Sequence, residues 1–444
     1  MKSRTRRLGF AAATAVAATA IIPGAHAQSA DALIEKLVQK GILTSKEARE
    51  LREEADKDVT KASASKTGLP GWVNSIQFGG DFRGRFEGFY SGNPAAVDRN
   101  RFQYRLRFGA TVSMLDNMDV GIRLASSGDT ASNPISGNQT FDNNASKKPL
   151  SVDLAFARWT AINSPEWQAV FTVGKMENPM VFTPAVMDRD YTPEGFGQQF
   201  TYRAGERHEF RLNLGEFVLE ERAASSLDTY LVSGQVRWDA KWSPKWQTTL
   251  GFAGLAISGK DSLTIADGQL NIGEGNTRIG GTSAGAPAYN FNPFIVDAAV
   301  TYVVPEVSFY KGAFPIRLSG EFLHNPAAPR DNEAYSLKLT MGKAGKKGLW
   351  ETSYELREVQ ADSIYEELPE SDFNAFTQAA RMTGGTAGFI GGTNVRGHIF
   401  RVGYTPFDSL TLGVTLWVTD AVHETPVGSA AGATRIQVDA LWKF

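Results

Sequence analysis

Arginines at alternate positions are the residues of this 444-residue chain whose type and spacing indicate a functional surface. In residues 101–108 every even-numbered residue is apolar, and the odd-numbered ones include Arg101, Arg105 and Arg107. Residues two apart share one face of a β-strand, so their guanidinium groups would form one positively charged surface. Such a surface raises the local concentration of anions and lowers that of cations.

Other reactive side chains show no useful spacing. Beyond the N-terminal segment the histidines are His208, His324, His398 and His423, and none has a ligand spacing such as His-x-x-x-His. The chain has no cysteine, which excludes disulfides and Cys-ligated zinc or iron–sulfur sites, and it has no P-loop, dinucleotide fingerprint or EF-hand series. We therefore predict no catalytic site, metal or cofactor. A lipase on the outer wall of a barrel remains an alternative, because its serine and histidine need be adjacent only in space.

Composition excludes two further classes of protein. The 46 basic and 48 acidic residues nearly balance, which argues against a nucleic-acid binder. A mean hydropathy of -0.25 excludes a bundle of apolar transmembrane helices. The 44 glycines and 11% aromatic residues suit an all-β protein.

The N-terminus has the pattern of a secretory signal peptide. Arg4, Arg6 and Arg7 precede an apolar run over residues 8–22, and Ala25-His26-Ala27 gives an A-x-A cleavage site. The run is about 15 residues long, short of the ~20 that a bilayer core requires. We predict a signal peptide over residues 1–27, with an uncleaved anchor as the alternative.

A short helical segment is expected next. Leu33, Leu37 and Val38 follow helical spacing, and Thr44 with Glu47 makes a capping box for a second helix. This predicts a periplasmic helical hairpin over residues 28–58, acting as a docking element or as a spacer. Residues 59–74 are predicted to be a linker, and residues 75–444 a transmembrane β-barrel.

After Trp72 the hydrophobic period changes to two, and sixteen segments of about ten residues follow. They lie near residues 76–90, 100–115, 118–127, 151–162, 166–175, 195–203, 207–218, 230–241, 245–256, 293–304, 314–324, 334–342, 348–359, 397–406, 409–418 and 434–444. Ten residues suffice for a tilted strand to cross a bilayer. The sixth segment, 195–203, alternates poorly.

The connections between these segments alternate between short and long. Asp116-Asn117 and Ser243-Pro244 are short, whereas residues 128–150, 258–292 and 360–396 form long connections between the short ones. Turns at one end and long loops at the other are typical of a transmembrane antiparallel barrel with both termini in the periplasm.

The last strand carries a more specific pattern. Ile436, Val438, Ala440 and Trp442 share one face, and the chain ends on Phe444. This ending is similar to the assembly signal of bacterial outer-membrane barrels. With the signal peptide, the short helical segment and the run 78–83, the whole arrangement resembles the putative-porin family.

The resemblance implies a pore in the bacterial outer membrane, commonly a homotrimer. Its partners would be outer-membrane lipid and small hydrophilic solutes or ions, with no nucleic acid. The family's motifs are diffuse patterns, and they transfer no binding residue.

Since lipid cannot solvate charge, the charged member of each alternation must point inward. Fifteen basic and ten acidic residues occupy such positions, so the predicted wall is net basic. The predicted pore-lining residues are Arg83, Arg85, Arg101, Arg105, Arg107, Arg123, Arg211, Arg237, Arg317, Lys338, Arg357 and Arg401. The first six form a basic strip that predicts weak anion preference. Alternatively, these arginines pair with acidic neighbours and only stiffen the wall.

A sixteen-stranded barrel leaves an aqueous channel that something usually narrows. By resemblance to general porins, the third long loop, residues 176–194, is the candidate. Its constriction charges would be Asp188, Arg189, Asp190 and Glu194, opposite the basic strip; an ordinary external loop is the alternative. The sequence thus predicts a porin for passive diffusion, with a structural or adhesive barrel with a plugged lumen as the rival.

Overall fold

The computed structural model describes residues 69–92, 98–126, 135–223, 228–264, 275–281, 285–374, 392–423 and 432–444. The signal peptide, the helical hairpin and most of the linker predicted above lie outside these residues. The chain divides into two compact units, residues 1–74 and 75–444, and the second holds the sheet. No helix among the described residues is both long and apolar enough to span a membrane.

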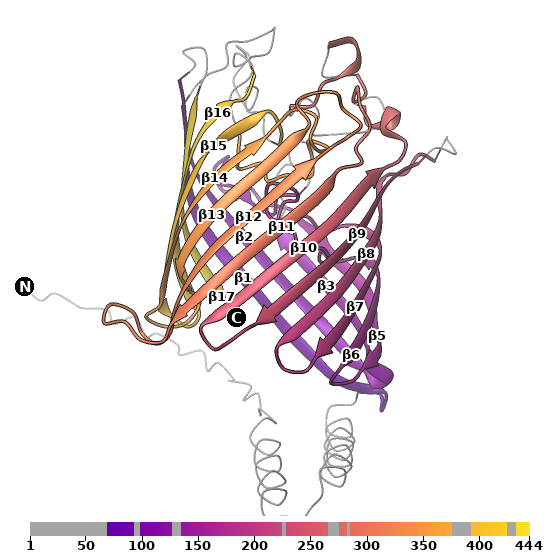
Figure 1. Cartoon of the computed structure of the whole chain (residues 1–444), viewed down its shortest axis with the longest axis vertical. Coiled ribbons are helices and arrows are strands. Elements are labelled where there is room, and N and C mark those ends of the chain that lie inside the picture. Colours follow the sequence, from indigo (N-terminus) through magenta and orange to yellow (C-terminus); the bar gives the residue numbers. More distant parts are fainter. Residues whose placement is uncertain are drawn as a thin grey trace, which may run out of the picture. The chain divides into compact units, whose positions relative to one another are not determined.

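Sixteen long strands form a closed antiparallel ring (Figure 1). They are β1 (Val73–Ser91), β2 (Arg99–Met114), β3 (Met118–Ser126), β5 (Leu150–Asn163), β6 (Trp167–Lys175), β7 (Glu194–Ala204), β8 (His208–Glu220), β9 (Thr229–Lys241), β10 (Trp246–Ile257), β11 (Phe294–Val304), β12 (Phe314–His324), β13 (Glu333–Gly342), β14 (Trp350–Val359), β15 (Val395–Phe407), β16 (Leu410–Ala421) and β17 (Ala433–Lys443). Each long strand pairs with the next, and the predicted all-β barrel of sixteen strands is confirmed.

The last strand closes the ring against the first. β17 pairs with β1 in a continuous antiparallel register, from Asp81 opposite Lys443 to Ser91 opposite Ala433. A closed ring leaves no strand edge with unpaired backbone groups, which a bilayer could not satisfy.

Period-two alternation gives the barrel two different faces. In β9 the side chains of Leu231, Gln235 and Arg237 are buried inside, whereas Tyr230 and Val236 on the other face are exposed. The same parity holds around the ring, and most large exposed side chains on the outer face are apolar. The sequence therefore sets a polar interior against an apolar exterior.

Turn chemistry fixes the short connections. The β2–β3 turn includes a short 3-10 segment, η1 (Leu115–Asn117), where Asp116 and Asn117 adopt left-handed φ angles of 63° and 59° that these residue types tolerate. At the β5–β6 and β9–β10 turns, the hydroxyls of Ser164 and Ser243 accept hydrogen bonds from the backbone N–H groups of Trp167 and Trp246. Each of these turns needs only a few residues.

Two details of the ring differ from what the alternation of apolar and polar residues predicts. β7 is a full strand although Gln198 interrupts its outward apolar face, which includes Phe196 and Phe200. The two-residue strand β4 (Gln139–Thr140), which the sequence did not predict, pairs with β2. It does so within the long β3–β5 connection, at a point where β3 has already ended.

Candidate functional site

The connection between β6 and β7, residues 176–193, folds into the barrel and is here called loop A. Its Glu177 pairs with Arg123 of β3 at 2.8 Å. Farther along, Thr183 donates its backbone N–H to Glu321 of β12 at 3.2 Å. Asp190 then binds Arg105 of β2 at 3.0 Å. Because these partners lie on strands in different parts of the ring, loop A crosses the interior.

A second connection, between β14 and β15, also lines the interior over residues 360–374 and is here called loop B. Glu370 pairs with Arg357 of β14 at 2.8 Å, and Asp372 pairs with Arg435 of β17 at 2.7 Å. Two backbone hydrogen bonds join loop B to loop A: Asp188 donates to the Leu368 carbonyl at 2.6 Å, and Glu370 donates to the Pro184 carbonyl at 2.9 Å. The interior is therefore narrowed by two connected loops.

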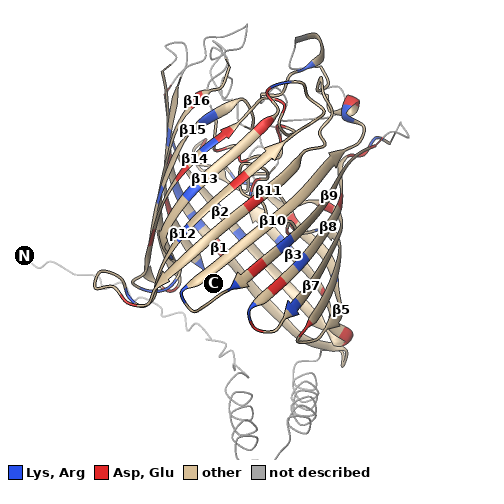
Figure 2. Ribbon diagram, in the orientation of Figure 1, with Lys and Arg blue, Asp and Glu red and all other residues tan. Residues whose placement is uncertain are grey.

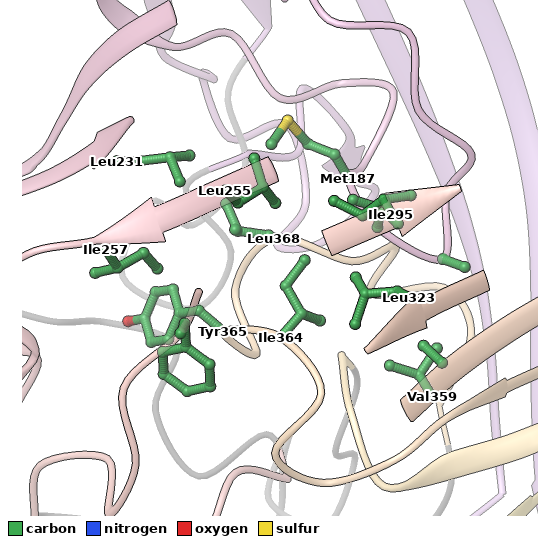
Figure 3. Close-up of a cluster of buried hydrophobic side chains, with 14 of the residues drawn as sticks. Met187, Leu231, Leu255, Ile257, Ile295, Leu323, Val359, Ile364, Tyr365 and Leu368 are labelled. Atoms are coloured by element: carbon green, nitrogen blue, oxygen red, sulfur yellow. The ribbon is translucent and has the colours of Figure 1, made fainter. Parts of the chain in front are cut away.

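A hydrophobic cluster anchors both loops on one side of the ring (Figure 3). Met187 of loop A and Leu368 of loop B pack against inward side chains at the long-loop ends of the strands, such as Leu231, Ile295 and Leu323. These side chains are at most 2% exposed. Burial of a large apolar side chain stabilises a structure by about 1.5–3 kcal/mol, so the cluster fixes both loops in place.

The opposite part of the wall carries the basic strip, formed by Arg83, Arg85, Arg101, Arg105, Arg107 and Arg123 on β1 to β3. Five of the six arginines hold a carboxylate. Arg85 pairs with Asp439 at 2.7 Å, Arg105 and Arg107 share Asp81 at 3.1 and 2.7 Å, and Arg101 pairs with Glu87 at 2.5 Å. Arg123 pairs with Asp153 as well as with Glu177. The exception is Arg83, which donates to the amide oxygen of Asn138 at 2.6 Å.

Glu87 is the most buried carboxylate of this wall. It is fully buried and binds Arg101 from one side and Arg435 from the other, each at 2.5 Å. The side-chain amide of Gln437 donates a further hydrogen bond to it at 2.6 Å. Such a set of charged hydrogen bonds makes this part of the wall rigid.

The other predicted pore-lining residues also divide into those that pair closely with a carboxylate and those that do not. Arg211 pairs with Asp239, and both Arg357 and Arg401 pair with Glu355 and Glu370. Arg237 reaches Asp297 at 2.8 Å across the intervening strand, where Gly251 leaves the space that a side chain would fill. Arg317 donates only to the Thr301 hydroxyl at 3.4 Å, and Lys338 lies 3.8 Å from Glu355.

The four predicted constriction charges occupy different places. Asp190 does not stand opposite the basic strip but binds it directly, at Arg105 and Arg107. Arg189 is exposed and borders two cavities of the interior. Glu194 is outside loop A, since it is the first residue of β7, and it pairs with Lys175.

Asp188 faces other carboxylates. Burial, together with the negative charge of Asp190, raises the pKa of Asp188 to about 8. In loop B, nearby positive charges outweigh burial. Burial alone would raise the pKa of Asp372, but the guanidinium groups of Arg435 and Arg85 lower this pKa below its usual range. The two loops thus place a carboxyl that titrates near neutral pH beside one that stays ionised.

Positions of Lys, Arg, Asp and Glu are distributed over the strands and loops of the barrel (Figure 2), and charged residues line the cavities that the loops leave. A cavity of about 240 Å³ lies between the basic strip and the acidic residues Asp188, Asp190 and Asp372. A second, of about 250 Å³, lies between loop A and the inward faces of β9 to β14. A third, of about 630 Å³, borders residues 176–179 and the strands from β1 to β7.

The comparisons with known proteins agree with this architecture. Residues 93–262 match the sequence profile of the family described as "Putative porin". The match covers less than half of the chain, so it shows a similarity to this family over that stretch. Together with the closed barrel, it points to an outer-membrane channel. No curated protein sequence matches this chain.

Solved structures were also compared with this chain. The high-pH structure of OprB from Pseudomonas putida is 10% identical, has a TM-score of 0.51, and is matched over 83% of this chain and 94% of that chain. The channel DcaP of Acinetobacter baumannii is 11% identical with a TM-score of 0.46, over 83% and 97% of the two chains. At these identities we take only the fold from the first comparison.

The histidines each have a separate partner. His208 accepts from the Trp238 indole at 3.4 Å, His398 contacts the Tyr354 hydroxyl at 2.9 Å, and His423 contacts Asp331 at 2.6 Å. In the part of the chain that the structure describes, no group of three or more His, Cys, Asp or Glu residues could hold a metal ion.

Sequence reasoning missed the whole of loop B. Its acidic residues Glu370 and Asp372 pair with arginines on two of the last strands, Arg357 on β14 and Arg435 on β17. One signal was available, since Ile364, Tyr365 and Leu368 place large apolar side chains in a long connection where an external loop would be polar.

Proposed function

We propose that this chain forms a water-filled channel through which small hydrophilic solutes and ions diffuse passively, with a weak preference for anions. One observation carries the proposal: the barrel is closed, and it contains cavities on several sides of loops A and B. Charged inward side chains line these cavities. Charged groups of this kind require water or ionic partners. A ring of sixteen strands has room for both.

The pairing of the inward charges supports a weak preference instead of a strong one. Carboxylates neutralise nine of the twelve predicted pore-lining cations at distances of 3.6 Å or less. Arg83, Arg317 and Lys338 have no such partner among the described residues. Lys338 has only the more distant Glu355, at 3.8 Å, so two unpaired cations and one weakly paired cation support a preference for anions that does not exclude cations.

A structural or adhesive barrel with a plugged lumen is the second candidate. The hydrophobic cluster favours it, because Met187, Leu368 and their strand partners hold both loops firmly in the interior. The two candidates predict opposite permeabilities for the same fold.

A liposome-swelling assay separates them. Refolded protein is reconstituted in liposomes, which are then diluted into isotonic solutions of sugars of increasing size. The porin proposal predicts swelling that becomes slower as the sugar grows. Swelling no faster than that of protein-free liposomes, with all the protein folded on a gel, would support the plugged barrel.

We further propose a homotrimer, and a chain in which residues 1–27 are a cleaved signal peptide and residues 28–58 a periplasmic helical hairpin. The family resemblance supports the trimer, and the A-x-A motif at Ala25 to Ala27 supports the cleavage. Native mass spectrometry of protein extracted from outer membranes tests both. Three copies of a chain that starts at Gln28 are expected; a monomer or an intact N-terminus would contradict the respective proposal.

A further inference from the structure

Three cations face one cavity of the interior, and among the described residues only one of them, Lys338, lies within 4 Å of a carboxylate, that of Glu355 at 3.8 Å. Arg317 of β12, Lys338 of β13 and Arg189 of loop A all line the cavity of about 250 Å³. Arg189 and Arg317 are exposed, and the Lys338 side chain keeps 22% of its surface accessible. Their charged ends therefore meet the solution in the barrel.

Strand register brings two of the three together. Arg317 stands opposite Thr340, and Lys338 stands opposite Ser319 on the neighbouring strand, so the two cations are diagonal neighbours on the inward face. Side chains in this relation lie about 7–8 Å apart at the backbone and long ones reach each other. Arg189 approaches from loop A closely enough to repel Lys338 electrostatically.

The carboxylates that share the cavity already have partners. Asp297 binds Arg237 at 2.8 Å, and Glu355 binds Arg357 and Arg401 at 2.6 and 3.0 Å. The third, Glu321, accepts hydrogen bonds from both the backbone N–H and the hydroxyl of Thr183. Among the described residues, the cavity thus holds three neighbouring cations, and each of its carboxylates has a closer partner than these three.

We propose that Arg189, Arg317 and Lys338 form a binding station for small oxyanions such as phosphate or a carboxylate. Guanidinium and ammonium groups donate charge-assisted hydrogen bonds to such anions, and the planar fork of arginine binds two of their oxygens. The inference rests on the proposed porin function. It assigns the anion preference to β12, β13 and loop A, whereas the sequence suggests the basic strip.

The test compares two double variants that remove the same charge. R317Q/K338Q removes two cations of the station, and K346Q/K347Q removes two exposed lysines of the β13–β14 turn. Binding of inorganic phosphate to refolded protein in detergent is followed by ³¹P line broadening, which does not depend on conduction. We expect wild-type protein and K346Q/K347Q to bind alike, and R317Q/K338Q to bind about tenfold more weakly, since charge-assisted bonds are lost.

Phosphate block of single-channel current in planar bilayers gives the second readout. We expect phosphate to reduce the wild-type current and to have less effect on R317Q/K338Q. Equal phosphate binding by the two double variants would overturn the station even if the channel conducts. Phosphate binding that R317Q/K338Q weakens would support the station even if the barrel does not conduct, in which case only the porin proposal fails.

Discussion

The barrel carries arginines on two sides, and the two sets differ in their partners. On the basic strip, Arg105 is 5% exposed and bound to two carboxylates, Asp81 and Asp190. On β12, Arg317 is exposed, and among the described residues its hydrogen-bond partner is the Thr301 hydroxyl. Arginines of the first kind strengthen the wall, and those of the second kind set the electric field that a solute meets. Charge selectivity therefore depends on which charges remain unpaired, and a count of arginines does not give it.

The largest effect is expected from removing the inward part of loop A. Deletion of residues 185–192 takes Asp190 from the strip and Arg189 from the station, and it removes Met187 from the hydrophobic cluster. A sixteen-stranded barrel is wide without such a loop, so single-channel conductance should rise about twofold or more. Deletion of the exposed residues 143–147 serves as the control and should leave conductance unchanged. Unchanged conductance in the first variant would show that loop A does not narrow the passage.

The next largest effect concerns the buried carboxylate of the strip. Glu87→Gln leaves Arg101 and Arg435 without the carboxylate that both bind. Breaking a buried ion pair costs about 3–5 kcal/mol, so the free energy of unfolding in urea should fall by roughly that amount. Glu206→Gln, in the exposed β7–β8 turn, is the matched control. Equal unfolding midpoints would mean that the strip does not stiffen the wall.

Replacing one arginine from the basic strip and one from β12 should change the free energy of unfolding by smaller amounts. Arg105→Gln leaves Asp190 short of its closest ion pair and should lower the free energy of unfolding by about 1–3 kcal/mol. Arg317→Gln removes no carboxylate contact and should change it by at most about 0.5 kcal/mol. The ion selectivity should respond in Arg317→Gln despite unchanged stability. The reverse order of stabilities would refute the division between the two sides.

The smallest effect on ion selectivity is expected from a pH dependence that arises in loop A. Folding raises the pKa of Asp188 from its ordinary value of 3.8 to about 8. The folded state therefore binds the extra proton, and its stability declines as pH rises from about 4 to about 8. Ionisation adds a negative charge beside Asp190, so anion preference should weaken between pH 6 and pH 9. In Asp188→Asn, the reversal potential should change less over this range than in the wild type; a full wild-type response in that variant would exclude Asp188 as the titrating group.

Much of the ring could be predicted from the sequence. Strict alternation and the loop-length pattern give all sixteen strands with small shifts at their ends, such as β14 beginning at Trp350 instead of 348. The period of two is a local property of each strand, and β7 forms despite its poor alternation because neighbours on both sides complete its hydrogen bonds. Local pattern and ring closure together determine the fold.

The interior could be predicted only in part. Alternation indicates that Arg105 and Arg317 share the inward face, but pairing depends on contacts between residues far apart in the chain, such as Arg85 with Asp439. The path of a long loop depends on its packing against many strands. No local sequence pattern therefore predicted that Glu370 and Asp372 of loop B would pair with arginines of the barrel wall.

The central claim is that an open channel crosses the barrel and that unpaired cations give it a weak anion preference. The reversal potential of refolded wild-type protein in a planar bilayer, under a gradient of potassium chloride, tests it most directly. We predict conducting channels whose reversal potential has the sign of chloride preference and moves toward zero in R317Q/K338Q. Silent membranes with folded protein, or a clear preference for potassium, would contradict the account.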